Sequence, residues 1–182
     1  MDSLQSELLD KIASVKITCS FVVGEDGQVV DDQGGSKGLG NQTDLELLKA
    51  LRANAEVVLT SGLTARVEEY RMPRHADLAI FTRRGVAGLN LKPKAGQKLQ
   101  ILTPPLVNSY REAIDAVRSK YATIHVEFGP AGARAIKDQI EVFVISSVHE
   151  SGLSKFLAEL ELTETDRFFT PDLFITLAVG RG

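Results

Sequence analysis

Three short segments of the sequence carry residues that can hold a phosphate group. A glycine lets backbone N–H groups approach an anion, a helix N-terminus carries partial positive charge, and a guanidinium can donate two parallel hydrogen bonds to a phosphate. Each segment follows an apolar run: Gly62 and Thr64 follow residues 56–60, Arg83 and Arg84 follow residues 78–82, and Gly129 follows residues 122–128. One such segment alone is most often an ordinary turn, but three in succession indicate one phosphate-rich ligand, such as a dinucleotide.

Buried parallel strands must position these segments. Short apolar runs typical of such strands cover residues 56–60, 78–82, 99–103 and 122–128. Four helical patterns alternate with these runs. Two are expected to begin at N-caps, one at Thr43 or Asp44 and one at Thr64, and the other two cover residues 109–120 and, starting with Pro130, residues 130–138. This alternation predicts an α/β fold with a mostly parallel central sheet flanked by helices. Because ligands of open parallel sheets bind at the carboxyl ends of the strands, the three segments are expected to meet at one edge.

The two ends of the chain complete this sheet. Residues 3–13 have the spacing of an amphipathic helix, and residues 15–23 and 140–148 are rich in β-branched side chains. Residues 160–162 and 173–179 are expected to form two strands around a polar connector, which gives an antiparallel strand or hairpin at the C-terminal end. No linker, repeat or low-complexity tract interrupts the sequence, so residues 1–182 are expected to form a single domain.

Composition excludes several classes of function. The 182 residues carry a net charge of −3, which argues against a nucleic-acid partner, and the only cysteine, Cys19, excludes a disulfide framework and a multi-cysteine zinc site. The three histidines stand apart from one another, so no metal site is expected. The N-terminus is acidic and no apolar run approaches the ~20 residues of a membrane span, so a cytoplasmic protein without a membrane partner is expected.

Several segments, in their order and spacing, resemble a known family. They are residues 20–27, residues 51–64 (with the Leu51-Arg52-Ala53 triplet and Ser61-Gly62-Leu63-Thr64) and residues 124–140. Together they resemble the dihydrofolate-reductase-like reductase domain of riboflavin biosynthesis, which is the C-terminal half of the bifunctional deaminase–reductase and also occurs in stand-alone relatives. The resemblance extends over roughly residues 15–148. No deaminase domain is expected within these 182 residues, since its zinc site would need two later cysteines.

The resemblance implies a cofactor and a reaction. NADPH would lie across the strand ends, and hydride would pass to a C=N or C=O carbon of a small heterocycle, with 5-amino-6-(5-phosphoribosylamino)uracil as the expected substrate. Gly62 and Thr64 would lie near the pyrophosphate, Thr82, Arg83 and Arg84 near the 2′-phosphate, and Gly129 at the diphosphate. The family also implies a homodimer.

The same resemblance implies the substrate site. Arg52 would anchor the ribose phosphate, and Glu127 would face the pyrimidine or ribityl end. Ser20 and Asn41 would contact the substrate. Asp26 would lie by the nicotinamide, and Asp26 and Glu127 are the expected catalytic residues.

Some residues depart from the family pattern and leave alternatives open. Phe128 replaces one of two glycines, so its ring either clashes with the cofactor or points into the core. A non-catalytic, nucleotide-binding dimeric protein on the same fold is therefore one alternative. A reductase of another substrate, such as a pterin, is a second, in which Asp44 or Glu46 would match the pteridine-binding carboxylate of dihydrofolate reductase.

His125 shares a strand face with Glu127, and two interpretations of it remain. Strand alternation places both side chains on the same side of the sheet. In the first interpretation the carboxylate raises the pKa of His125 and the two form an acid/base couple. In the second, His125 packs between sheet and helix and Glu127 alone reaches the cleft.

Overall fold

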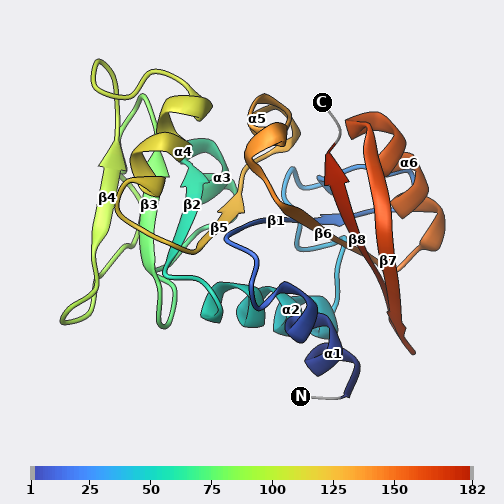
Figure 1. Cartoon of the computed structure of the whole chain (residues 1–182). Helices are drawn as coiled ribbons and strands as arrows, with labels where there is room; N and C mark the ends of the chain where they lie inside the picture. Colours follow the sequence, from blue (N-terminus) through green and yellow to red (C-terminus); the bar gives the residue numbers. More distant parts are fainter. Residues whose placement is uncertain (1–2, 181–182) are drawn as a thin grey trace.

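One eight-stranded sheet organises the chain. The computed structural model describes residues 3–180, with the burial of side chains from residue 6 onward. The strands are β1 (Ile17–Val23), β2 (Val57–Ser61), β3 (Asp77–Phe81), β4 (Leu99–Leu102), β5 (Ile124–Glu127), β6 (Val142–Ser147), β7 (Leu162–Thr170) and β8 (Leu173–Gly180). Their order is β4-β3-β2-β5-β1-β6-β8-β7 (Figure 1). The first six are parallel, and β8 and β7 close the sheet as an antiparallel hairpin, which confirms the expected fold class.

Six α-helices flank this sheet. They are α1 (Ser3–Ile12), α2 (Gln42–Ala53), α3 (Gly62–Val67), α4 (Tyr110–Arg118), α5 (Pro130–Ala135) and α6 (Glu150–Leu160), with a 3₁₀ turn at Lys137–Gln139. Helices α4, α5 and α6 cover one face of the sheet, where alternate residues of β1, β2, β5 and β6 form the largest apolar cluster. Among the described residues, no helix is long and apolar enough to cross a membrane.

The apolar core on the opposite face is divided into two. At one end, Leu8, Leu47 and Leu51 of α1 and α2 pack on the β6–β8 region. At the other end, Ala65 of α3 and Tyr70 pack on β2 and β3. Between the two clusters, β1 and β5 present polar side chains to the same face: Thr18, Ser20, His125 and Glu127. The division leaves room for a polar site at the centre of the sheet.

Several sequence-based boundaries were wrong. Helix α6 was not expected, and most of the supposed polar connector after it belongs to β7. Helix α5 ends at Ala135, because residues 137–139 continue as a 3₁₀ turn.

Two helix caps were also assigned to the wrong residue. Asn41 caps α2 by accepting a hydrogen bond from the backbone N–H of Asp44 (3.0 Å), so the cap is neither Thr43 nor Asp44. Ser61 caps α3, accepting from the N–H of Thr64 (3.1 Å), so Thr64 is the capped residue and not the cap.

Candidate active site

The carboxyl ends of three neighbouring strands bring the predicted anion-binding segments together. In the sheet register, Ser61 at the end of β2 pairs with Phe81 of β3, and Thr60 pairs with Glu127 at the end of β5. Strands β3, β2 and β5 are parallel neighbours that end at one level. Thr64, Arg83 and Gly129 therefore emerge at one edge of the sheet, as the sequence predicted.

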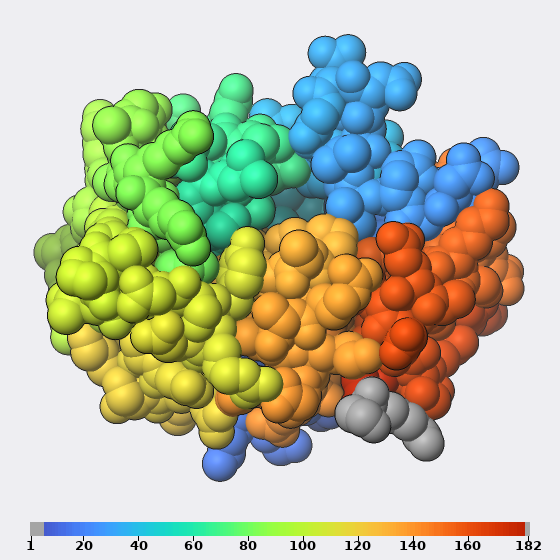
Figure 2. All heavy atoms as spheres, turned by 90° about the horizontal axis from the view of Figure 1, so that it is seen from above, coloured from blue at the N-terminus to red at the C-terminus, as the bar shows by residue number. Residues whose placement is uncertain are grey.

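A cavity of about 910 Å³ opens beside this edge. Its walls come from α2, the loop that precedes it, α3 and the segment 68–72, together with the ends of β1, β5 and β6. In Figure 2, which looks onto the top of Figure 1, the blue segment around residue 30 and the teal segment around residue 65 stand beside each other, with the orange segment around residue 130 in front. Most of the lining surface is apolar, and its polar side chains include Ser20, Asp44, Arg52, Tyr70, Glu127 and Ser146, with further charged residues at Lys37, Glu68, Glu69 and Arg71. An apolar cavity with a few convergent polar groups is the usual form of a small-molecule site.

Glu127 and Arg52 form a two-pronged ion pair at the floor of this cavity. Arg52 donates from Nε to Oε2 (2.7 Å) and from Nη2 to Oε1 (2.6 Å), and the hydroxyl of Tyr70 donates to the same carboxylate. The guanidinium also lies over the Tyr70 ring, 5.0 Å from its centroid. Burial opposes the charge on Glu127, but the adjacent guanidinium outweighs it and holds the pKa of the carboxyl below its usual range. Glu127 thus remains a carboxylate, and Arg52 is held by it.

His125 lies under the same floor and is fully buried. Its Nδ1 is 2.7 Å from Thr18 Oγ1 and its Nε2 is 3.0 Å from Ser20 Oγ, while Glu127 Oε2 is 3.4 Å from Nε2. Burial lowers the pKa of His125 to about 4, although Glu127 acts in the opposite direction. Glu127 does favour the charged ring, as the first interpretation supposes, but burial outweighs it, so the two side chains do not form a charged acid/base couple. His125 is neutral, and two hydroxyls of β1 hold its ring.

Asp44 is a functional candidate that the sequence indicated only through a match to dihydrofolate reductase. It lines the cavity from the first turn of α2 and accepts a hydrogen bond from the hydroxyl of Ser146. Burial raises the pKa of its carboxyl, and within residues 3–180 no lysine or arginine lies within ion-pair distance of it. Helical spacing contained a further signal, because Asp44 precedes Leu47, Leu48 and Leu51 on one helix face.

Three expected site residues have other roles in the structure. Asn41 lines the cavity, but its Oδ1 caps α2 and its Nδ2 donates to the carbonyl of Asp172 (2.8 Å). Asp26 lies outside the cavity lining, in an exposed turn, and pairs with Lys155 of α6 (3.0 Å). Thr82 is buried, accepts from the N–H of Arg84 (3.2 Å) and donates to the carbonyl of Gly85 (3.2 Å), so it shapes the turn after β3.

Gly62 and Gly129 differ in the space around them. A Cβ on Gly62 would lie 2.4 Å from Thr82 Oγ1, so this glycine is required for α3 to pack against β3. A Cβ on Gly129 would meet nothing within 4 Å. The backbone of Gly129 therefore borders open space at the strand edge, where an approaching ligand could contact it.

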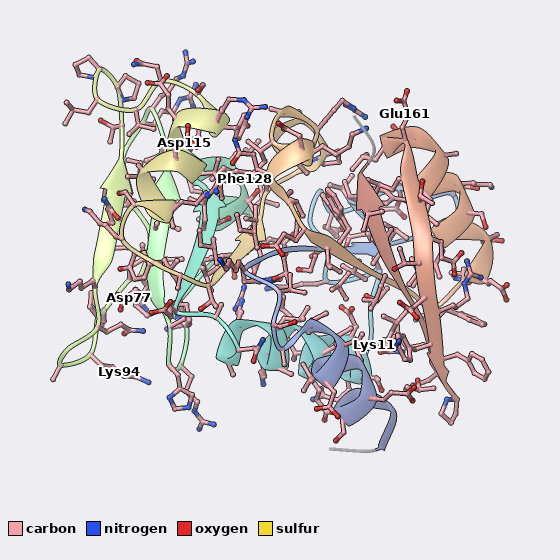
Figure 3. The ribbon with its side chains drawn as sticks, in the orientation of Figure 1. Lys11, Asp77, Lys94, Asp115, Phe128 and Glu161 are labelled. Carbon is pink, nitrogen blue, oxygen red and sulfur yellow. The ribbon has the colours of Figure 1, made fainter. Side chains whose placement is uncertain are left out.

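The ring of Phe128 points into the core. Its exposed fraction is 3%, and it packs edge-on against Tyr110 of α4 with ring centroids 4.9 Å apart. Figure 3 shows Phe128 beside the end of β5, between α4 and α5. Of the two alternatives for this residue, the structure selects the core position.

Arg83 borders a second, smaller hollow of about 370 Å³ at the same edge of the sheet. Tyr110 and Arg111 at the start of α4 also line it. Arg111 is paired with Asp138 (2.8 Å). The edge follows the order of the strands: the hollow beside Arg83 lies after β3, the start of α3 after β2, and Gly129 after β5. The large cavity borders both α3 and Gly129.

Comparison with known proteins identifies the fold. No family model and no curated protein sequence matches the chain. Among solved structures, a pyrimidine reductase-like protein from Corynebacterium diphtheriae superposes with a TM-score of 0.68 at 16% identity, covering 96% of this chain and 95% of that one. The chain has the dihydrofolate-reductase-like fold.

Two further structures with this fold are similar at comparable identity. A deaminase/5-amino-6-(5-phosphoribosylamino)uracil reductase from Thermotoga maritima gives a TM-score of 0.65 at 14% identity, and this chain spans 60% of its length and is 97% covered. Dihydrofolate reductase from Enterococcus faecalis, complexed with NADP(H), gives 0.58 at 11% identity, with 91% of this chain and 97% of that one covered. At these identities the similarity establishes the fold alone.

The residues present fit a dinucleotide phosphate. The open space at Gly129, the capped start of α3 and the exposed guanidiniums of Arg83 and Arg84 all lie at one edge. The bulky ring of Phe128 is withdrawn from this edge. Across residues 3–180, no group of three His, Cys, Asp or Glu side chains could hold a metal ion.

Proposed function

We propose that this chain is an NADPH-dependent reductase that acts on a C=N or C=O bond of a small nitrogen heterocycle. The observation that carries the proposal is the continuity between the 910 Å³ cavity and the strand edge at Gly129. A reductase needs a substrate site and a cofactor site that share a boundary, so that the reacting atoms are held in contact. Here that boundary is the end of β5, where Glu127 lines the cavity and Gly129 lies at the edge.

The chain's own residues would bind and orient both reactants. Backbone N–H groups at the start of α3 and at Gly129 would hold the diphosphate, and Arg83 and Arg84 would hold the 2′-phosphate. When bound, NADPH supplies the hydride. The apolar walls of the cavity, with Leu48, Leu63 and Val67 among them, would exclude water from the reacting atoms.

A reduction also needs a proton, and Asp44 is the group proposed to hold it. Glu127 is unsuited, because its ion pair with Arg52 keeps it a carboxylate. Asp44 lines the cavity without a cationic partner among the described residues, and burial raises the pKa of its carboxyl. It can therefore retain a proton on its carboxyl oxygen at a higher pH than an ordinary aspartate.

Two substrates are proposed for testing. The first is 5-amino-6-(5-phosphoribosylamino)uracil, which the name of the Thermotoga maritima protein includes. The second is a pterin such as dihydrofolate, favoured by the position of Asp44 and by the engagement of Nε and Nη2 of Arg52 with Glu127, which leaves fewer N–H groups of that guanidinium for a phosphate.

NADPH fluorescence and absorbance test the proposal directly. Titration of the protein with NADPH measures binding, and loss of absorbance at 340 nm with each substrate measures turnover. We expect saturable NADPH binding and turnover of one of the two substrates. Binding without turnover would favour the non-catalytic alternative, and no binding of NADPH would refute the reductase.

We also propose that the protein acts as a cytoplasmic homodimer. Light scattering coupled to size-exclusion chromatography measures the mass directly, and a dimer of the 19.8 kDa chain is expected near twice that value. Fractionation of the cells that produce the protein tests the location.

A further inference from the structure

Three side chains beneath the cavity form a hydrogen-bonded chain that hydride transfer does not use. Thr18 and Ser20 extend from β1 on either side of the His125 ring, which lies on the neighbouring strand β5. Thr18 and His125 are buried, whereas Ser20 lines the cavity. A buried imidazole between two hydroxyls has only a few consistent arrangements of its protons.

Glu127 decides which nitrogen of His125 carries the proton. Its Oε2 lies 3.4 Å from His125 Nε2, and its ion pair with Arg52 keeps it negatively charged. A lone pair on Nε2 would face a carboxylate and be repelled, so Nε2 carries the hydrogen. Nδ1 is then the acceptor in a neutral ring, and the hydroxyl of Thr18, 2.7 Å away, must donate to it.

This arrangement also fixes the role of Ser20. Its Oγ lies 3.0 Å from the protonated Nε2 and therefore accepts a hydrogen bond from it. The hydroxyl proton of Ser20 then has no partner in the protein, because the contact with His125 is the only hydrogen bond that this hydroxyl makes among residues 3–180. Since Ser20 lines the cavity, that proton is available to a ligand.

We infer that Thr18 and His125 fix the hydroxyl of Ser20 as a hydrogen-bond donor into the cavity, so that the ligand places a lone-pair atom, a carbonyl oxygen or an imine nitrogen, against it. His125 is a positioning residue, and Ser20 is the residue that contacts the ligand. The inference deepens the proposed function and rests on it only for the identity of the ligand.

The charged groups around His125 keep this arrangement constant through neutral pH. Burial lowers the pKa of the ring to about 4, the nearby Glu127 favours the protonated ring, and Arg52 disfavours it. The ring is thus neutral well above pH 4, and the Ser20 donor does not switch near neutrality.

The cavity also presents a second polar group, the carboxyl of Asp44, on the same face of the sheet as this donor. Val22 pairs with Ser146 across β1 and β6, and Ser20 lies two residues earlier on β1, about 7 Å along the strand. Ser146 donates its own proton to Asp44. A flat heterocycle lying over β1 and β6 would therefore meet the hydroxyl of Ser20 at one point and the carboxyl of Asp44 at another.

Nitrogen NMR of the histidines tests the proton arrangement without any ligand. We expect the ¹⁵N and ¹H signals of His125 in the full chain to show a neutral ring protonated on Nε2, unchanged between pH 8 and pH 5. Thr18→Val is expected to shift the Nδ1 signal and leave Nε2 protonated. The matched control is Thr176→Val, a buried threonine of β8 whose hydroxyl bonds the Asp166 carbonyl, and it is expected to shift neither signal. A ring protonated on Nδ1, or a charged ring, would overturn the inference.

A crystal soak with dimethyl sulfoxide, which accepts hydrogen bonds and donates none, tests the role of Ser20. We expect its oxygen within hydrogen-bond distance of Ser20 Oγ in the wild-type chain and no ordered molecule there in Ser20→Ala. A soak with pyrrole, which donates and has no lone-pair acceptor, is the control and is expected to leave Ser20 unoccupied. Sulfoxide bound elsewhere in the cavity, or pyrrole bound at Ser20, would refute the donor. Neither measurement depends on NADPH or turnover, so the inference and the proposed reductase can fail separately.

Discussion

The charged side chains of the cavity differ in how far the protein itself satisfies them. Glu127 accepts from both Arg52 and Tyr70, which leaves this pair electrically balanced. Among residues 3–180, the carboxyl of Asp44 accepts a side-chain hydrogen bond only from the hydroxyl of Ser146. A ligand therefore gains more from a contact with Asp44 than from one with the ion pair, because Arg52 and Tyr70 already occupy the carboxylate of Glu127.

Removing the charge of Glu127 is expected to destabilise the fold. In Glu127→Gln the buried part of Arg52 loses its counter-charge, and such losses cost roughly 3–5 kcal/mol in fully buried pairs. Because Arg52 is 23% exposed, we expect a smaller loss of about 2–3 kcal/mol in the free energy of unfolding, measured by urea denaturation. Asp138→Asn breaks the exposed pair with Arg111 and serves as the control, with little change expected. An unchanged urea midpoint in Glu127→Gln would show that the pair does not stabilise the fold.

The lowered pKa of Glu127 gives this stabilisation a definite pH dependence. A carboxyl whose folded pKa lies below its unfolded value stabilises the fold above the unfolded pKa, and loses that effect as the pH falls through the folded pKa. In wild type the free energy of unfolding is therefore expected to fall on acidification below about pH 4.5. Glu127→Gln is expected to show a flatter curve over the same range, and equal slopes in the two proteins would contradict the assignment.

Asp44→Asn is expected to raise the stability of the fold and to lower turnover. Burial raises the folded pKa of Asp44, so wild type is more stable at low pH and loses that advantage as the pH rises through the folded pKa. The amide keeps an oxygen for Ser146 and carries no charge, and we expect a gain of roughly 0.5–2 kcal/mol at pH 7 by thermal denaturation, a usual gain when a functional residue is replaced. Turnover in the 340 nm assay is expected to fall. A variant that is more stable and equally active would remove Asp44 from the mechanism.

At the level of helices and strands, two glycines have different roles: Gly152 is needed for packing, whereas Gly129 borders the space proposed for the cofactor. A Cβ on Gly152 of α6 would lie 1.9 Å from the backbone oxygen of Gly24, at the end of β1, where neither backbone can yield easily. A Cβ on Gly129 would lie in open space, and the backbone there has ordinary dihedral angles (φ −68°, ψ 174°). The first glycine is needed for α6 to dock, and the second is not needed for folding.

Gly129→Ala consequently tests the cofactor edge without disturbing the fold. We expect an unchanged melting temperature and a dissociation constant for NADPH raised at least about tenfold, or ~1.4 kcal/mol, because the methyl group would occupy the space in which we propose the diphosphate to bind. Gly152→Ala is the comparison and is expected to lower the melting temperature. If Gly129→Ala binds NADPH as wild type does, the diphosphate does not lie at this edge.

How far the sequence predicts each element depends on how regularly its side chains alternate. The buried strands and the amphipathic helix α4 were predicted because their apolar residues keep one period. Strand β7, at the edge of the sheet, carries Thr, Glu, Asp and Arg on both faces, so it resembles a loop. Helix α6 was missed because Gly152 near its start suggests a turn, although that glycine is required by the contact with Gly24.

The candidate site was predictable where the residues that form it come directly after a strand in the sequence. Arg83, Thr64 and Gly129 come right after apolar runs, so the sheet alone determines that they meet. Tyr70 was not found, because it lies in an irregular segment after α3 and reaches Glu127 only through the tertiary fold. The Asp44–Ser146 contact joins positions 102 residues apart and has no local pattern.

At the scale of the whole molecule, an acidic chain is proposed to bind an anionic cofactor. The net charge is −3, so NADPH binding would depend on local cations at the strand edge and not on the overall field. Arg83 and Arg84 are exposed there. Lys98, also exposed, precedes β4 at the opposite edge of the sheet.

Arg83→Ala is expected to reduce the preference for NADPH over NADH. Loss of the guanidinium that we propose to pair with the 2′-phosphate should weaken the binding of NADPH by about 1–2 kcal/mol, or roughly five- to thirtyfold, and leave the binding of NADH almost unchanged. Fluorescence titrations with both nucleotides measure this ratio, with Lys98→Ala as the control. Equal weakening of the two nucleotides would place Arg83 away from the 2′-phosphate.

At the end of β5, two consecutive residues, Phe128 and Gly129, lie one in the core and one at the surface. The ring of Phe128 is clamped by Tyr110 in the interior, while the very next backbone unit, Gly129, faces the solvent. The position of that glycine is thus set by an aromatic anchor on α4. Shortening Tyr110 would loosen the backbone at Gly129 from behind, and it would also widen the hollow that Tyr110 lines together with Arg83.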